Sequence, residues 1–269
     1  MTDTAPPAKG RLAGKVVLVV GGGSDGPPRP DESVAIGNGR ATCIQCAREG
    51  AAVVVADIKE ELADETVEVI RQEGGQAEAV RTDASDSEDC LRAVASAVKA
   101  FGGLHLLVNA LGIVDGQSIL DVDVDTFDRL YQVNLRSNLL TMKHAAPEMI
   151  KAGGGAIVNV SSIAALRSGA GIGYETTKAA QLALSRSAAV TLAKHNIRVN
   201  TIILGTIDSP ILRRHLTQEA ISQYSTRIPL GRAGTPWETA SAIVFLLSDE
   251  ASYVTGTELL LDGALRAAP

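Results

Sequence analysis

AIVNVSSIAALRSGAGIGYETTK, residues 156–178, joins an expected buried strand to an expected helix. Tyr174 and Lys178 are four residues apart, so a helix places them on one face. A neighbouring ammonium favours the phenolate and lowers the pKa of a phenol, ordinarily about 10. With Ser162 opposite them, the pair would form a proton-transfer device. The same spacing also occurs on solvated helix faces, so the rest of the chain has to decide between the two interpretations.

Strand-like and helix-like segments alternate on both sides of this stretch. Short runs rich in β-branched residues predict strands, and longer periodic runs predict helices. The expected strands are 15–20, 52–56, 77–80, 104–108, 156–160, 197–204 and 258–261, and the expected helices include 60–73, 90–101, 124–152, 174–195 and 239–247. This order predicts an α/β fold with a single doubly wound parallel sheet of about seven strands and helices on both faces.

Length and composition fit one domain. The chain has 269 residues, of which 45% are hydrophobic and only 3% aromatic, which suits aliphatic strands packed between helices. We expect a disordered tail over residues 1–11 and a single domain over residues 12–269. The net charge of −6 without a basic cluster speaks against a nucleic-acid partner. The absence of a long apolar run or a signal-peptide pattern leads us to expect a cytoplasmic protein that does not enter a membrane.

Three cysteines do not suggest a disulfide framework, because their number is odd. Cys43 and Cys46 form a C-x-x-C pair, but they lie in an apolar helical run without a second ligand pair. We therefore expect core or helix-surface thiols, and neither a redox site nor a metal site.

Glycines surround the junction between the first strand and the first helix. They occur as Gly21, Gly22 and Gly23 with Ser24, and again as Gly37-Asn38-Gly39, with twelve additional residues, 25–36, between the two groups. Such a turn lets backbone N–H groups and the helix N-terminus face a pyrophosphate. A plain surface turn is the alternative interpretation.

A carboxylate at the end of the second strand supports nucleotide binding. Asp57 follows Gly39 by eighteen residues, where a carboxylate accepts hydrogen bonds from the adenosine ribose and repels a 2′-phosphate. This favours NAD over NADP, although Lys59 and Arg40 are close enough in sequence to keep NADP open. A helix N-cap is the alternative role for Asp57.

With these pieces in place, the chain resembles the classical short-chain dehydrogenase/reductase family over residues 12–264. The resemblance rests on short motifs in the order and at nearly the spacing of the family. They are the glycine loop, Asp57, Asp83-Ala84, Asn109-Ala-Leu-Gly112, Asn134, Ser162, Tyr174-x-x-x-Lys178, Arg198-Val-Asn200 and Tyr253-Val-Thr-Gly256. It implies a Rossmann-like fold that binds a dinucleotide.

The resemblance implies roles for the catalytic residues. Tyr174 would be the acid/base, Lys178 would lower its pKa and hold the nicotinamide ribose, and Ser162 would steady the substrate oxygen. Asn134 would keep a helix distorted so that a bound water links Lys178 to solvent. Because Ser162 lies twelve residues before Tyr174, one fewer than usual in the family, Ser161 remains an alternative.

The resemblance also implies cofactor contacts beyond the glycine loop. Asp83 and Ala84 would contact the adenine, Asn109 would support the adenosine ribose side, and the backbone of Ile207 would contact the nicotinamide carboxamide. The inserted segment, residues 25–36, departs from the common pattern, and we expect it to bulge outward near the pyrophosphate or the adenosine.

The expected function is reversible, NAD-dependent hydride transfer between a secondary alcohol and its ketone. Residues 206–232, here called the lid segment, would cover the substrate. The alternatives are an NADPH-dependent 3-oxoacyl-thioester reductase and a non-catalytic dinucleotide-binding sensor. By resemblance, we expect a homotetramer assembled through helices 124–152 and 174–195.

Overall fold

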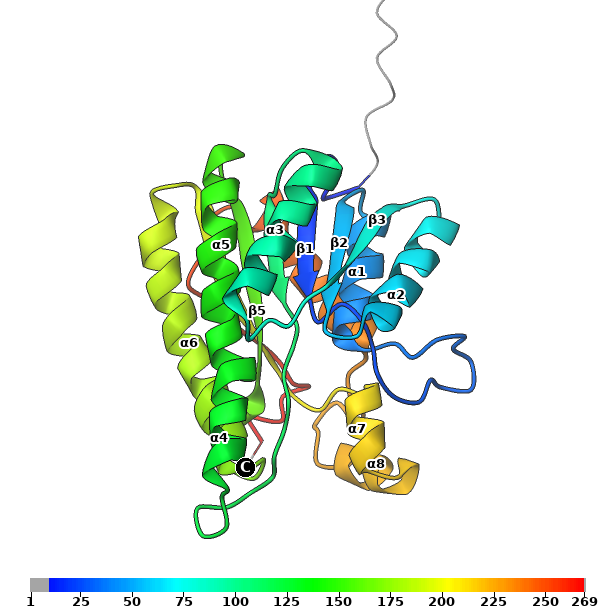
Figure 1. Cartoon of the computed structure of the whole chain (residues 1–269). Coiled ribbons are helices and arrows are strands. Elements are labelled where there is room, and N and C mark those ends of the chain that lie inside the picture. Colours follow the sequence, from blue (N-terminus) through cyan, green and yellow to red (C-terminus); the bar gives the residue numbers. More distant parts are fainter. Residues whose placement is uncertain (1–9, 269) are drawn as a thin grey trace, which may run out of the picture.

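Seven parallel strands form the centre of the computed structural model, which describes residues 10–268 (Figure 1). Their order across the sheet is β3-β2-β1-β4-β5-β6-β7. The strands are β1 (Val16–Val20), β2 (Ala52–Asp57), β3 (Gln76–Arg81), β4 (Leu106–Asn109), β5 (Gly155–Ser162), β6 (Ile197–Leu204) and β7 (Glu258–Leu261). The predicted fold class is confirmed.

Helices cover both faces of the sheet. One layer holds α1 (Asn38–Arg48), α2 (Glu60–Gln72) and α9 (Pro236–Leu247), and the other holds α3 (Ser87–Phe101), α5 (Ser137–Lys151) and α6 (Ile172–Ala193). Shorter helices lie in the connections, namely α4 (Val124–Leu130), α7 (Pro210–His215) and α8 (Gln218–Ser225). None of the described helices has the length and apolar character needed to cross a membrane.

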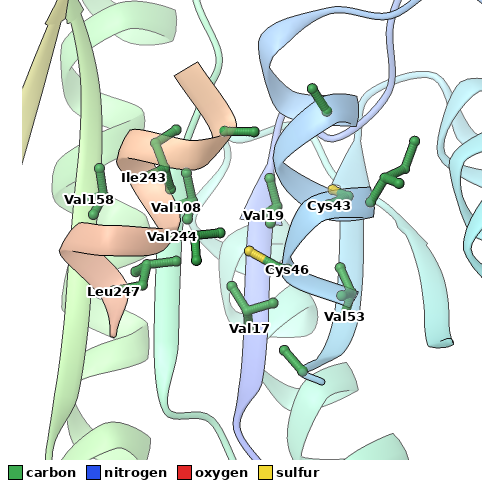
Figure 2. Packing of buried hydrophobic residues seen from close by; sticks show 14 of the residues in the cluster. Val17, Val19, Cys43, Cys46, Val53, Val108, Val158, Ile243, Val244 and Leu247 are labelled. Atoms are coloured by element: carbon green, nitrogen blue, oxygen red, sulfur yellow. The ribbon is translucent and has the colours of Figure 1, made fainter. Parts of the chain in front are cut away.

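Alternate residues of each strand supply the two cores, as the period of a strand requires. Val17 and Val19 of β1 pack toward α1 and α9, whereas Val16 and Leu18 pack toward α3 and α5. Figure 2 shows the first core, in which Cys43 and Cys46 of α1 lie against these valines. All three cysteines are free and buried, and burial raises the pKa of Cys46 to about 12. Of the two environments expected for Cys43 and Cys46, the structure shows the core.

The long helix expected over 124–152 is interrupted. Residues Tyr131–Arg136 form a π-helical segment between α4 and α5. Within it, the side chain of Asn134 bonds to the backbone of Ile113 in the loop after β4, and its carbonyl oxygen accepts from the Gln181 side chain of α6. Pro147, by contrast, lies inside α5 without ending it.

Two expectations from local sequence need correction. The prolines and glycines of residues 205–234 predict irregular chain, but α7 and α8 lie there, with Pro210 in the first turn of α7 and Thr217 capping α8. The sequence Ser85-Asp-Ser-Glu88 predicts a capping box with Ser85 as the cap, but Asp86 caps α3 by accepting a hydrogen bond from the backbone of Asp89. The sequence Thr235-Pro-Trp-Glu238 also predicts a capping box, and this one is present at α9.

The strand order reverses between β1 and β4. The chain moves outward from β1 to β3 on one side and from β4 to β7 on the other, so the loops after β1 and β4 diverge and leave a crevice at their carboxyl ends. Residues 1–9 of the expected tail lie outside the described residues, and Arg11 is paired with Glu49 at 2.6 Å.

Candidate active site

A groove of about 310 Å³ opens at this crevice. Nine residues that the sequence assigned to a cofactor line it, and they come from the loops after β1, β2 and β3 and from the start of α1. They are Gly21, Gly23, Ser24, Gly37, Asn38, Gly39, Asp57, Asp83 and Ala84.

The glycines allow a close approach of backbone to backbone. Gly21 has a φ of +82°, and a Cβ on Gly39 would overlap the carbonyl oxygen of Gly21. Helix α1 begins after Gly37 without a side-chain cap, which leaves its first N–H groups for an anion. The buried Oδ1 of Asn38 also has no partner among the described residues. These features fit the pyrophosphate of a dinucleotide.

Asp57 faces the same groove and is not a helix cap. Its Oδ2 accepts a hydrogen bond from the backbone N–H of Gly23 at 3.0 Å, and its Oδ1 accepts one from that of Lys59 at 3.1 Å. Lys59 itself is the N-cap residue of α2. Because a carboxylate oxygen accepts more than one hydrogen bond, Asp57 retains capacity for two ribose hydroxyls.

Arg40 and Lys59, the two cations that left NADP possible as the coenzyme, lie in different environments. The side chain of Arg40 is fully buried and donates to Thr66 Oγ1 at 2.8 Å and to the carbonyl oxygen of Leu62 at 2.9 Å, so it serves α2 and not the groove. Lys59 lines the groove, and its Nζ lies 2.6 Å from Asp25 Oδ2. Arg214 of α7 contacts the other oxygen of Asp25 at 2.8 Å. The sequence did not indicate the parts played by Asp25 and Arg214.

Four of the predicted cofactor residues lie outside the groove lining, namely Asn109, Ile207, Tyr174 and Lys178. Asn109 is buried, with its Nδ2 donating to Asn159 and its Oδ1 accepting from Thr141, so it joins β4 to β5 and α5 behind the groove. Ile207 is also buried, and its carbonyl oxygen accepts a hydrogen bond from the backbone of Ser209.

The two adjacent serines at the end of β5 point in opposite directions, as strand geometry requires. Ser161 Oγ donates to the carbonyl oxygen of Lys178 at 3.0 Å and is buried. Ser162 Oγ accepts a hydrogen bond from the backbone N–H of Ala164 at 3.2 Å. The nearby Ser162 hydroxyl lowers the pKa of the Tyr174 phenol less than burial raises it. The net pKa of Tyr174 is therefore raised, opposite to the direction that the neighbouring lysine predicts.

Lys178 lies beneath the tyrosine. Its Nζ is 5.7 Å from the centroid of the Tyr174 ring and donates to the carbonyl oxygen of Val160 at 3.0 Å. Burial lowers the pKa of this lysine to about 8. A Cβ on Gly112, which lines the groove, would lie 3.2 Å from Nζ, so the lysine adjoins the inner end of the groove.

Asn134 connects the π-helical segment to the same point. Its Oδ1 accepts from the backbone N–H of Ile113 at 2.8 Å, and its Nδ2 donates to the Ile113 carbonyl oxygen at 2.9 Å. The backbone carbonyl oxygen of Asn134 accepts from Gln181 Nε2 at 2.5 Å and from Asn138 Nδ2 at 2.8 Å. The helix is thus distorted where the resemblance implies it.

Gln181 and Asn138 were not among the predicted site residues. Each follows a predicted residue by three or four positions, Gln181 after Lys178 and Asn138 after Asn134. A polar side chain three or four positions from a candidate catalytic residue lies on the same helix face, and this spacing could have identified both residues from the sequence.

Curated relatives match nearly the whole chain. A 2,5-dichloro-2,5-cyclohexadiene-1,4-diol dehydrogenase from Sphingobium indicum is 38% identical over 94% of this chain and 96% of its own. A cyclopentanol dehydrogenase from Comamonas testosteroni is 38% identical over 96% of this chain and 99% of its own.

Solved structures agree with these matches. A short-chain dehydrogenase/reductase from Burkholderia xenovorans superposes with a TM-score of 0.89 at 35% identity, covering 97% of this chain and 99% of its own. A 7α-hydroxysteroid dehydrogenase complexed with NADH and 7-oxo glycochenodeoxycholic acid gives a TM-score of 0.86 at 34% identity, covering 94% of each chain. A family model described as "Enoyl-(Acyl carrier protein) reductase" matches residues 34–265. The chain therefore belongs to the classical short-chain dehydrogenase/reductase family and is an oxidoreductase.

Proposed function

We propose that this protein catalyses reversible hydride transfer between a secondary alcohol and its ketone with NAD. One observation supports the proposal: Lys178, which lies beside Tyr174 and Ser162, adjoins Gly112 in the lining of a groove that fits a dinucleotide. Two neighbouring hydroxyl groups can both contact a single substrate oxygen. An alcohol or a ketone offers such an oxygen, whereas a carbon–carbon double bond does not.

The side chains of this protein would handle the proton. In the oxidative direction, Ser162 donates a hydrogen bond to the alcohol oxygen while Tyr174 accepts its proton. Tyr174 must be a phenolate to accept this proton. Lys178, held by the Val160 carbonyl oxygen, would place a cation beside that phenolate, and a nearby opposite charge favours the ionised form. Bound NAD supplies the hydride acceptor.

The charge at the adenosine end supports NAD over NADP. Asp57 holds a carboxylate in the groove lining, Arg40 is committed to α2, and Lys59 is already paired with Asp25. A 2′-phosphate would meet the negative charge of Asp57, and Lys59, the lysine of the groove lining, is already paired with a carboxylate.

A cyclic secondary alcohol is the proposed substrate class. The relatives named for 2,5-dichloro-2,5-cyclohexadiene-1,4-diol and cyclopentanol, and the structure named for a 7α-hydroxysteroid, carry the reacting group on a ring. The lid segment presents apolar surface to the groove at Pro210 and Ile211, which suits a hydrocarbon ring.

The test is a matrix of substrates and cofactors. Cyclopentanol, cyclohexanol, a cyclic diol, a 7α-hydroxysteroid and a 3-oxoacyl thioester should each be assayed with NAD(H) and NADP(H). We expect turnover with at least one cyclic alcohol and NAD. Highest activity with the thioester and NADPH would support the 3-oxoacyl reductase instead, and NADH binding without any turnover would support the sensor.

We also propose a homotetramer built on α5 and α6, which lie side by side in the layer that covers one face of the sheet (Figure 1). Leu139 of α5 and Val190 of α6 are 49% and 82% exposed, and apolar surface of this kind is commonly covered by another subunit. Sedimentation analysis that finds only monomers would contradict this.

The three free cysteines suit a reducing compartment, and we propose the cytoplasm.

A further inference from the structure

We propose that Asp25, in the inserted segment, sets the coenzyme preference by occupying the two cations at the adenosine end of the groove. This inference rests on the proposed NAD-dependent function. Lys59 Nζ lies 2.6 Å from one oxygen of Asp25, and the guanidinium of Arg214 lies 2.8 Å from the other. All three residues line the groove together with Asp57.

The inserted segment is fixed in place by contacts with the lid segment. Arg29 donates to Asp208 Oδ2 at 2.8 Å, and Arg213 donates to Asp208 Oδ1 at the same distance. Arg213 also donates to the carbonyl oxygen of Pro27 at 3.3 Å. Figure 1 shows the inserted segment, in blue, leaving the sheet on the side of α7. Asp25 therefore stands at an anchored position between α7 and the start of α2.

The charges explain the expected selectivity. Lys59 and Arg214 contribute two positive charges, and Asp25 and Asp57 contribute two negative charges, so this group has no net charge. A 2′-phosphate is bound by free cations that donate charge-assisted hydrogen bonds. Neutralising Asp25 would leave a net charge of +1 and release both cations toward the groove.

A purely structural role for Asp25 predicts something different. Its two ion pairs join residues that are each nearly half exposed, and such pairs often contribute little to stability. If they served only to hold the inserted segment, losing them would weaken NADH and NADPH binding in parallel. The ratio of the two affinities would then stay constant.

The experiment compares Asp25→Asn with Asp31→Asn. Asp31 is an exposed carboxylate of the same inserted segment and does not belong to the ion pairs of the described residues. Fluorescence titration with NADH and NADPH measures binding directly, without turnover. We expect Asp25→Asn to shift the affinity ratio toward NADPH about tenfold, and Asp31→Asn to leave it unchanged.

Second-site changes identify the cations. Lys59→Gln or Arg214→Gln, each combined with Asp25→Asn, should remove part of the gain in NADPH affinity. An unchanged ratio in Asp25→Asn, with NADH binding intact, would overturn the inference and leave the proposed function standing. A wild-type protein that binds neither coenzyme would overturn both.

Discussion

Replacing Lys178 by methionine should make the protein more stable at neutral pH. The side chain is 4% exposed, and burial lowers its pKa from 10.5 to about 8. Below pH 8 the lysine is charged in both the folded and the unfolded protein. Only the folded protein loses free energy by burying this charge away from water. A difference of about 2.5 pH units, at about 1.4 kcal/mol per unit, corresponds to about 3 kcal/mol of lost stability.

Methionine retains the length and the apolar part of the side chain. It gives up the hydrogen bond from Nζ to the Val160 carbonyl oxygen, which costs about 1 kcal/mol. The net gain for Lys178→Met at pH 7 is therefore about 2 kcal/mol in the free energy of unfolding. Turnover should nevertheless be lost. Such a gain in stability with a loss of activity is expected where a group needed for function destabilises the fold.

The pH dependence has a definite sign. Because the folded pKa is depressed, the unfolded chain binds more protons between pH 8 and 10.5, so wild-type stability rises with pH across this window. The advantage of the variant should shrink as pH rises and should fall by about 2 kcal/mol between pH 7 and pH 10.

Urea unfolding of both proteins at pH 7 and pH 10 measures these differences. Lys143→Met is the matched control, since Lys143 of α5 is exposed and surface substitutions usually change stability by less than about 0.5 kcal/mol. A Lys178→Met protein that is less stable than wild type at pH 7 would refute the reasoning. So would a stability difference that is the same at both pH values.

Two further substitutions test the groove and a helix end. Gly112→Ala places a Cβ 3.2 Å from Lys178 Nζ and 3.4 Å from Asn134 Oδ1, so steady-state kinetics should show kcat lower by about tenfold with the melting temperature nearly unchanged; full activity would contradict the assigned geometry. Thr235→Ala removes the capping box of α9 and should cost about 1 kcal/mol in urea unfolding, whereas Thr235→Ser should cost less. Equal losses in both would show that the hydroxyl is not responsible.

Most of the fold follows from local patterns. Short β-branched runs such as Val16–Val20 have no plausible buried alternative to a strand, and strict alternation with helices leaves a doubly wound sheet as the solution. The π-helical segment at Tyr131–Arg136 was not predictable in this way, because bonds to Ile113 and Gln181 create it. Those partners are distant in sequence.

In the candidate site, too, local sequence predicts some features, and contacts between distant residues decide the others. Tyr174 and Lys178 were found because one helix fixes their spacing, and Ser161 and Ser162 were separable only once the strand direction was known. The orientation of Arg40 depends on the packing of α1 against α2. The contact of Asp25 with Arg214 joins residues 189 positions apart, and no sequence periodicity reports such a pairing.

We propose above that the Tyr174 hydroxyl exchanges a proton with the substrate oxygen, which is bonded to the reacting carbon. Removing it with Tyr174→Phe leaves the ring in place beside Lys178 and the groove lining intact. The decisive measurement is turnover of an accepted alcohol alongside NADH titration of the same sample. We expect an NADH affinity within about threefold of wild type and a turnover reduced by at least about 100-fold. Turnover close to the wild-type rate, with NADH still bound, would contradict it.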